Sequence, residues 1–368
     1  MKTVRRLLYR DIVSAVLFAA IAFLSLFFFI DLVDELENIG RGQYTLGVAL
    51  TYALLEQPGH FYELFPIAVL IGTIFSMARL AQSSEYTILR TAGLGPWRAL
   101  SLLAVLGVAF ALVTFFIGDY VTPASERKAV AVKQVARGGL RLGRSGAWLK
   151  ERRTTADGER SYSINVAGTA AQGLLRGLRI FEFDADGRLL TRLAADHAKV
   201  GDDGTWHLTG VERTRWSHSG VAEAVQTERL AALNWPSTLT SAVVAAAVLP
   251  LSSMSTIELW RYTSHLASNE QAAQRYEIQF WKRALYPFAC LVMVALALPF
   301  AYMHGRGGGI SLKVFGGIML GISFVLLNNV AGHLGLLRNW TPWIVAATPS
   351  ALYLLLSLAA FSWLVRYR

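Results

Sequence analysis

The chain has 368 residues, of which 54% are hydrophobic and 16% are charged, and its mean hydropathy is +0.41. This balance excludes an ordinary soluble globular protein and predicts a large lipid-embedded fraction. The net charge of +10 could suggest a nucleic-acid partner, but acidic residues are interspersed among the basic ones and no arginine-rich run occurs. We therefore expect no nucleic-acid binding. The single cysteine, Cys290, lies in an apolar run, which excludes a disulfide within the chain.

Six apolar stretches are long enough, or can be extended far enough, to cross the hydrocarbon core as helices. In chain order they are residues 12–30, 64–78, 99–118, 284–303, 314–330 and 343–365. Pro66 falls near the start of the second stretch, where the first turn of a helix tolerates proline. Residues 44–55 are apolar but too short to cross, so we interpret them as an interfacial or re-entrant helix. A single span wrongly divided in two is the alternative.

Charges in the short loops predict the orientation of these spans. Basic residues precede the first span and follow the second, the fourth and the sixth, whereas acidic residues follow the first. The positive-inside rule therefore places both termini in the cytoplasm. No small-residue cleavage site follows the first apolar run, so we expect an uncleaved span rather than a signal peptide.

Residues 119–283 separate the third and fourth spans and carry polar turns between strand-like segments. The stretch RIFEFDADGRLLTRLAADHAKV predicts a hairpin with its turn at residues 184–187, and GDDGTW predicts the next turn. We expect a β-sandwich or jelly roll over residues 146–236.

Helical segments are expected to flank this β domain on both sides. The predicted parts are a membrane half (1–118), a helical stalk (119–145), the β domain, a return segment with an amphipathic helix (237–283) and a second membrane half (284–368). The predicted fold class is therefore an α-helical polytopic membrane protein with six spans and a β-jellyroll inserted between the third and fourth.

The sequence offers no catalytic or metal-binding motif. It has no HExxH pair and no GxSxG elbow, and GRGGG lacks the GK[ST] of a phosphate-binding loop. Ser125 and Lys128 form an isolated SxxK match, which we interpret as chance. His197, His207 and His218 lie in strand-like segments and are interpreted as sheet residues rather than ligands. We predict a non-enzyme with no metal site and no cofactor of its own.

The segment ARLAQSSEYTILRTAGLGP, residues 78–96, interrupts the apolar pattern and predicts a short helix near residues 84–93. Ser84 can cap it, Glu85 lies at the positive end of its dipole and Arg90 near the negative end. A helix of about two turns is far below the length at which isolated helices are stable, so a neighbour must hold it.

Ile88 and Leu89 give this short helix one small apolar face. Two interpretations follow from that face. The helix either rests on the lipid interface or docks into a cleft of a soluble cytoplasmic partner. The spacing alone does not favour one over the other.

Several stretches, taken in order, resemble one known family. They are FIDLVDELENIGRGQY, LAQSSEYTILRTAG, GDYVTP, a β-rich region, RYEIQFWKRALYP and HGRGGGISLKVFGGI. Together they resemble the permeases of the lipopolysaccharide-export ABC transporter, the LptF/LptG or YjgP/YjgQ family, over essentially the whole chain. MARLAQSSE and GRGQY are closer to the LptG branch than to the LptF branch.

The resemblance implies a heterodimer with an LptF-like sister permease, bound to an LptB-like ATPase dimer and to an LptC-like single-span protein. ATP and magnesium would bind the ATPase and not this chain. The two permeases would take lipopolysaccharide from the periplasmic leaflet of a Gram-negative inner membrane and expel it to a periplasmic bridge, with the β-jellyroll in the periplasm. Residues 84–93 would form the coupling helix, with Glu85 engaging the ATPase.

The resemblance also implies that Lys133 faces the substrate. Arg127, Lys128 and Arg137 are nominated from charge and location, because lipopolysaccharide carries phosphates. The first and fifth spans are expected to line the entry gate, which nominates Phe27 and Phe324.

The sequence departs from the family just beyond the first span. Where other members place lysines, this chain has Asp31, Glu37 and Asn38. Three explanations remain open: contacts from the sister permease and the Lys133 region, a bridging divalent cation, or a lipid A of different charge. A non-transporting anchor or assembly scaffold is the rival function, and it predicts a partner at residues 84–93 as well.

Overall fold

A computed structural model describes most of the chain: residues 2–41, 43–91, 93, 95–137, 146–155, 158–169, 174–201, 204–217, 224–239, 243–244, 251–268, 273–302 and 309–366. The chain folds as two units. The helical unit comprises Met1–Ile39, Leu46–Ala129 and Glu277–Arg368, and the β unit comprises Gly40–Thr45 and Val130–Tyr276.

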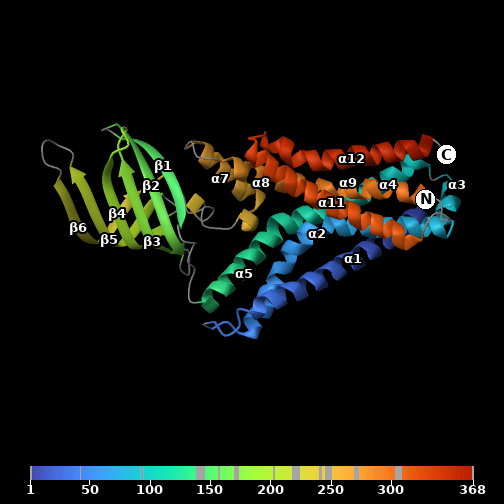
Figure 1. Ribbon diagram of the computed structural model, residues 1–368, viewed down its shortest axis with the longest axis horizontal. Helices are drawn as coiled ribbons and strands as arrows, with labels where there is room; N and C mark the ends of the chain where they lie inside the picture. Colours follow the sequence, from blue (N-terminus) through green and yellow to red (C-terminus); the bar gives the residue numbers. More distant parts are fainter. Residues whose placement is uncertain are drawn as a thin grey trace. The chain divides into compact units, whose positions relative to one another are not determined.

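Long apolar helices build the helical unit, since a helix satisfies its backbone hydrogen bonds internally, as lipid requires. They are α1 (Lys2–Leu36), α2 (Leu46–Gln82), α4 (Pro96–Phe116), α9 (Phe288–Ala297), α11 (Ile310–Leu337) and α12 (Pro342–Arg366), with the short α3 (Glu85–Thr91) and α10 (Pro299–Tyr302). The π-helix η1 (Ile117–Val121) continues α4 into α5 (Thr122–Arg137), and α8 (Gln274–Leu285) precedes α9 (Figure 1).

Five helices in the described part of the chain are long and apolar enough to cross a membrane. The pair α8 and α9 passes the same test together, with a 52° bend, and would supply a sixth span. The predicted fourth span, residues 284–303, is thus divided among α8, α9 and α10. Pro287 explains the bend, because proline disfavours a helical residue before it and lacks the N–H of a helix interior.

The interpretation of residues 44–55 as a separate interfacial helix is wrong. Residues 46–55 are the first part of α2, a single helix of 37 residues that contains Pro58 and Pro66 in its interior. Ala49 and Ala53 are fully buried, so packing stabilises this part of the helix beyond what its pattern indicates. The alternative, one span wrongly divided in two, is the correct one.

The π-helix η1 is held by a buried arginine. Arg283 of α8, 6% exposed, donates a hydrogen bond to the backbone carbonyl of Gly118 inside η1. Its guanidinium also lies 5.5 Å from the centre of the Tyr62 ring on α2. A π-turn lacks the regular bonding of an α-helix, so a side-chain donor from a neighbouring helix stabilises it.

The β unit contains one six-stranded antiparallel sheet. Its strands are β1 (Ala147–Thr155), β2 (Gly158–Thr169), β3 (Leu175–Phe183), β4 (Leu189–Val200), β5 (Thr205–Ser217) and β6 (Ala224–Pro236), in the order β1-β2-β3-β4-β5-β6 (Figure 1). The predicted inserted β domain is confirmed. Its described strands form a meander, in which each strand pairs with the next one along the chain. A jelly roll requires Greek-key crossovers, and the described strands have none, so the predicted strand order is not the observed one. The alternation of apolar and polar residues predicts which face of a strand is buried, but it does not predict the order of the strands.

The predicted β3–β4 hairpin is confirmed. The Asp184 carboxylate accepts a hydrogen bond from the Arg188 N–H (2.7 Å), and Gly187 has the positive φ, 78°, that such a turn requires. The next predicted turn also forms, because the Gly201 N–H donates to the Thr205 carbonyl (2.9 Å). These two turns fix the register of three central strands.

A buried carboxylate ties β1, one edge strand of the sheet, to the segment that follows β6, the other edge strand. Glu151 of β1 is fully buried and accepts hydrogen bonds from Arg153 Nε (2.7 Å), Ser237 Oγ (2.8 Å) and the Thr238 N–H (2.7 Å). Burial raises the pKa of Glu151, but the bonds from Arg153, Thr238 and Ser237 outweigh it and hold the pKa below its usual value. We call these four residues the Glu151 cluster.

In the described part of the return segment, two α-helices follow a short 3-10 helix, Leu251–Ser253, where a single amphipathic helix was predicted. α7 (Thr256–Ser268) ends before α8 begins, and residues 269–272 between them lie outside the described part. A capping box starts α7: the Ser255 N–H donates to the Glu258 carboxylate (2.8 Å), and the Glu258 N–H donates to Ser255 Oγ (3.3 Å). On the other side, the predicted stalk 119–145 contains α5, and residues 138–145 lie outside the described part.

Candidate functional site

The predicted short helix is present as α3, Glu85–Thr91. It follows α2 directly and lies at the end of the helical unit where α1 begins and α12 ends (Figure 1). Contacts between neighbouring elements agree with this placement, since the ring of Trp97 at the start of α4 lies 6.3 Å from the ring of Phe361 near the end of α12. The turn that contains α3 is thus at the same end as both chain termini.

The boundaries of α3 follow from its flanking residues. Ser84 stands at the N-cap position, because its carbonyl accepts the first helical bond from the Ile88 N–H (3.2 Å). Its φ of 60° departs from the extended backbone of ordinary N-cap residues, so the expected side-chain cap lacks its usual geometry. At the other end Gly93 has a φ of 99°, as expected of a glycine that ends a helix.

Among the described side chains of α3, Leu89 anchors the helix and others are directed outward. Leu89 is half-buried and packs against the apolar core of the helical unit, whereas Ile88 is 63% exposed. Glu85 in the first turn is exposed as well. Arg90 lies in the helix, but its side chain is outside the described part. The seven-residue helix therefore presents an acidic group and an apolar side chain on its free surface.

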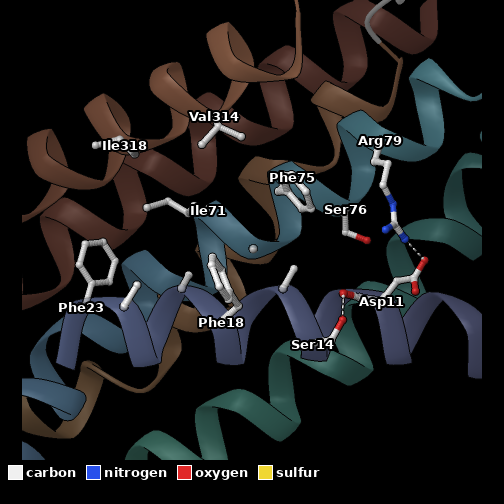
Figure 2. A pocket seen from close by; sticks show the side chains of 14 residues that line it. Asp11, Ser14, Phe18, Phe23, Ile71, Phe75, Ser76, Arg79, Val314 and Ile318 are labelled. Atoms are coloured by element: carbon white, nitrogen blue, oxygen red, sulfur yellow. Dashed lines mark hydrogen bonds and ion pairs between the residues drawn. The ribbon is translucent and has the colours of Figure 1, made fainter. Parts of the chain in front are cut away.

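A pocket of about 550 Å³ lies between α1, α2 and α11, and its lining is almost entirely apolar. Figure 2 shows side chains of the three helices directed toward this shared space. The lining residues are Asp11, Ser14, Ala15, Phe18, Ala19, Ala22, Phe23, Ile71, Gly72, Phe75, Ser76, Arg79, Val314 and Ile318. None of them was singled out as a site residue by the sequence, because nothing in an all-apolar helix indicates which face borders a pocket.

Two glycines explain why the three helices approach so closely. A Cβ at Gly72 of α2 would lie 2.5 Å from the backbone nitrogen of Val16 on α1. A Cβ at Gly317 of α11 would lie 2.6 Å from the Ile74 side chain of α2. Small residues at helix interfaces permit this approach in membranes. Both α1 and α11 thus pack tightly on α2, and the pocket is the space that they leave beside it.

The pocket has one polar end, and that end is close to α3. Arg79, in the last turn of α2, forms an ion pair with Asp11 of α1, with Nη2 and Oδ2 2.6 Å apart (Figure 2). Ser14 Oγ donates to the Asp11 backbone carbonyl (2.9 Å). Arg79 and Glu85 are close in the chain, separated by less than the length of two helical turns. A force that displaces α3 would therefore reach α2 next to this ion pair.

The Asp11–Arg79 pair is expected to hold α1 against α2 at this end. The change Arg79→Asp would place two carboxylates together and lower the free energy of unfolding by about 1 kcal/mol, the upper range for exposed pairs, because the Arg79 side chain is 52% exposed. The double change Asp11→Arg with Arg79→Asp should recover most of that loss. Detergent-unfolding titrations of the full chain measure both effects. A double variant as unstable as the sum of the two single variants would show that the residues do not interact.

Phe27 lies at the other end of α1, beside a polar cluster. Its ring centre is 4.8 Å from that of His60 on α2. His60 Nε2 is 2.8 Å from the Asp31 carboxylate, which also accepts a bond from Gln57 Nε2 (3.3 Å). The acidic Asp31 noted in the sequence is therefore engaged by α2. Phe324 lies elsewhere, 2% exposed in the core, with its ring edge against Tyr353 of α12 (5.3 Å between centres).

The four nominated basic residues all belong to α5, in different environments. Lys128 is exposed, whereas Arg127 and Lys133 are half-buried. Arg137 is the last residue of the helix, and its side chain lies outside the described part. Ser125, the other half of the SxxK match, is buried, and its hydroxyl donates to the Thr122 carbonyl (3.1 Å) rather than to a lysine.

Two histidines of the β unit that the sequence singled out are strand residues. His197 is in β4, where its Nδ1 is buried without a hydrogen-bond partner among the described residues, and His207 in β5 lies 2.8 Å from the Asn234 side chain of the neighbouring strand. His218 lies outside the described residues.

A bundle of apolar helices long enough to cross a membrane, interrupted by one antiparallel β domain, defines a polytopic membrane protein with an inserted β domain. Residues 6–364 match the family described as "Lipopolysaccharide export system permease LptF/LptG". The chain belongs to this family.

Two relatives agree with that assignment. The chain is 28% identical over 356 residues to the lipopolysaccharide export system permease protein LptG of Escherichia coli (strain K12), with 96% of both chains covered. It is 26% identical over 361 residues to the protein of the same name from Haemophilus influenzae, again with 96% of both chains covered. The resemblance carried by the sequence stretches is confirmed.

Proposed function

We propose that this chain is the LptG-type permease subunit of an ABC transporter that extracts lipopolysaccharide from the inner membrane, with ATP hydrolysed on a separate subunit. The observation that carries the proposal is α3. It is too short to be stable alone, it is anchored through Leu89, and it directs Glu85 and Ile88 outward. Such a helix suits a socket in a cytoplasmic ATPase, and α2 and α4 on either side of it would move with that socket.

The proposed orientation puts α3 and both termini in the cytoplasm and the β unit in the periplasm. Arg5, Arg6 and Arg10 are exposed at the start of α1, and Arg98 is exposed after α3. These residues support the orientation through the positive-inside rule. The proposed partners are an LptF-like sister permease, an LptB-like ATPase dimer and an LptC-like single-span protein.

Substrate contacts are proposed at the basic residues of α5, with Lys133 as the first candidate, because guanidinium and ammonium groups bind phosphates. Asp31 bears on the open question of the acidic residues beyond α1. Its carboxylate is already bonded to His60 and Gln57, so it would repel a phosphate less than a free acid would. This favours an explanation in which phosphate contacts come from α5 and the sister permease.

The test is ATP-dependent release of lipopolysaccharide. The chain is reconstituted into proteoliposomes with its sister permease, the ATPase and the single-span partner, and transfer of lipopolysaccharide to a soluble periplasmic acceptor is followed with and without ATP. We expect transfer only with ATP and only with both permeases present. Transfer that does not depend on ATP would leave the anchor or scaffold function as the better explanation. Substituting this chain for a known LptG, and separately for a known LptF, decides which branch it represents.

A further inference from the structure

We propose that the pocket between α1, α2 and α11 binds one acyl chain of an anionic phospholipid from the membrane leaflet next to α3. This inference goes beyond the export of lipopolysaccharide. Its assignment to the cytoplasmic leaflet, and with it the choice of phospholipid over lipopolysaccharide, rests on the proposed orientation. The pocket, its polar end and its helices are all within the helical unit.

The dimensions of the pocket fit a lipid tail. Its volume of about 550 Å³ is in the usual range for small-ligand sites. The lining of α1 extends from Asp11 to Phe23, which at 1.5 Å per residue is about 18 Å along the helix. One leaflet contributes about 15 Å of hydrocarbon, so the length of the pocket lining is close to the depth that one acyl chain spans in a leaflet.

A buried hydroxyl without a partner marks the polar end. Ser76 is 1% exposed, lines the pocket, and its Oγ has no hydrogen-bond partner among the described residues. Hydroxyls inside membrane helices usually bond the carbonyl four residues earlier, as Thr114 does to Phe110 (2.8 Å) and Ser25 does to Ile21 (2.8 Å). The free hydroxyl of Ser76 is suited to donate to an ester carbonyl, which every diacyl phospholipid carries at the head of its chains.

Charge at this end favours an anionic headgroup. Arg79 lines the pocket with its side chain half-exposed, and Asp11 balances it. The exposed Arg5, Arg6 and Arg10 on the first turns of α1 add positive charge at the same helix end. Each basic residue near a membrane surface contributes about 1 kcal/mol of attraction to anionic lipid. Lipopolysaccharide is the less suitable occupant, because in the proposed orientation its headgroup is in the opposite leaflet.

The test is retention of lipid by the full chain in its complex. The complex is equilibrated in nanodiscs containing palmitoyl-oleoyl-phosphatidylglycerol, phosphatidylethanolamine and lipopolysaccharide, extracted into mild detergent and examined by native mass spectrometry. We expect one phosphatidylglycerol per copy of this chain. The change Ala19→Trp fills the pocket and should reduce that retention about tenfold, since it displaces several buried methylene groups. The change Ser76→Ala should weaken retention less.

A matched control separates filling of the pocket from added bulk on α1. Leu17→Trp is on the same helix at an exposed position outside the lining, and it should retain phosphatidylglycerol as the unmodified chain does. If Ala19→Trp does not fold, Ala22→Leu adds less volume at a more exposed lining position and is used instead.

Retention of lipopolysaccharide instead of phosphatidylglycerol, retention of no lipid, or equal retention by all variants would overturn the proposal. The proposed transport function is decided separately, because lipid retention is measured without ATP and without transfer.

Discussion

Replacing Glu85 with arginine is expected to abolish ATP-dependent lipopolysaccharide release while the chain still folds and inserts. Glu85 is exposed in the first turn of α3, so its loss costs the fold little beyond about 0.5 kcal/mol of helix-dipole stabilisation. Leu89 continues to anchor the helix. In the complex, a reversed charge in the socket of the ATPase should cost about 2 kcal/mol or more, which weakens association about thirtyfold.

Two measurements follow for Glu85→Arg: co-purification of the ATPase and ATP-dependent release in proteoliposomes. Gln82→Arg is the matched control, because it adds positive charge at an exposed position at the end of α2 and leaves Glu85 in place. We expect the control to assemble and transport. Normal assembly and normal release by Glu85→Arg would remove Glu85 from the coupling site and favour a helix that only rests on the lipid interface.

Replacing Glu151 with alanine is expected to destabilise the β unit by about 3 kcal/mol, the lower end of the range for breaking a buried, hydrogen-bonded ion pair. Arg153, Ser237 and the Thr238 N–H would lose their shared acceptor. Because the Glu151 cluster joins β1 to the segment that follows β6, the loss should appear in β1 and next to the end of β6. Hydrogen–deuterium exchange of the full chain measures it, as faster exchange in β1 and in the residues after β6.

The pKa of Glu151 gives this prediction a pH dependence. The folded-state pKa is lowered, so the stabilisation is complete above the unfolded value, about 4.3, and is lost as the pH falls through the folded value. We expect Glu151→Gln to be less stable than the unmodified chain at pH 7, with the difference narrowing below about pH 4. Glu228→Gln, which alters an exposed ion pair with Arg213, should change exchange little at any pH. A constant difference from pH 7 to pH 3 would show that the charge of Glu151 is not what stabilises the sheet.

The sequence predicts the membrane helices well where charge-free runs are long. α1, α11 and α12 each contain the predicted span and extend beyond it, and the predicted third span covers most of α4 and the first residues of η1. The bounds of the second and fourth spans are harder to predict, because a proline can either lie inside a continuous helix or accompany a bend. Pro58 and Pro66 lie inside a continuous α2, whereas Pro287 accompanies a 52° bend. Neighbouring helices decide which role a proline takes, and local sequence does not contain that information.

The candidate site was predictable only where local chemistry marks it. The sequence marks α3 by its charged residues, by the glycine that ends it and by its short length, and the helix is present where predicted. The pocket depends on how α1, α2 and α11 face one another, and apolar helices do not reveal their faces. One signal was available: Asp11 stands among arginines at the start of the first span, and Arg79 stands at the end of the second. Opposite charges at the same predicted membrane depth indicate a possible pair.

The length of α2 has a consequence for the bilayer itself. At 1.5 Å per residue its 37 residues extend about 55 Å, nearly twice the 30 Å of a typical hydrocarbon core. The stretch from Phe61 to Ala78, which includes Glu63 near its start, is about 27 Å long, so in a bilayer centred on it the earlier part of the helix, with Gln57 and His60, would lie in the headgroup layer. The bonds from these two residues to Asp31 fix the same depth on α1. In a thicker bilayer these polar groups would enter hydrocarbon unless the helices tilted upright, so α1 and α2 match the protein to one membrane thickness.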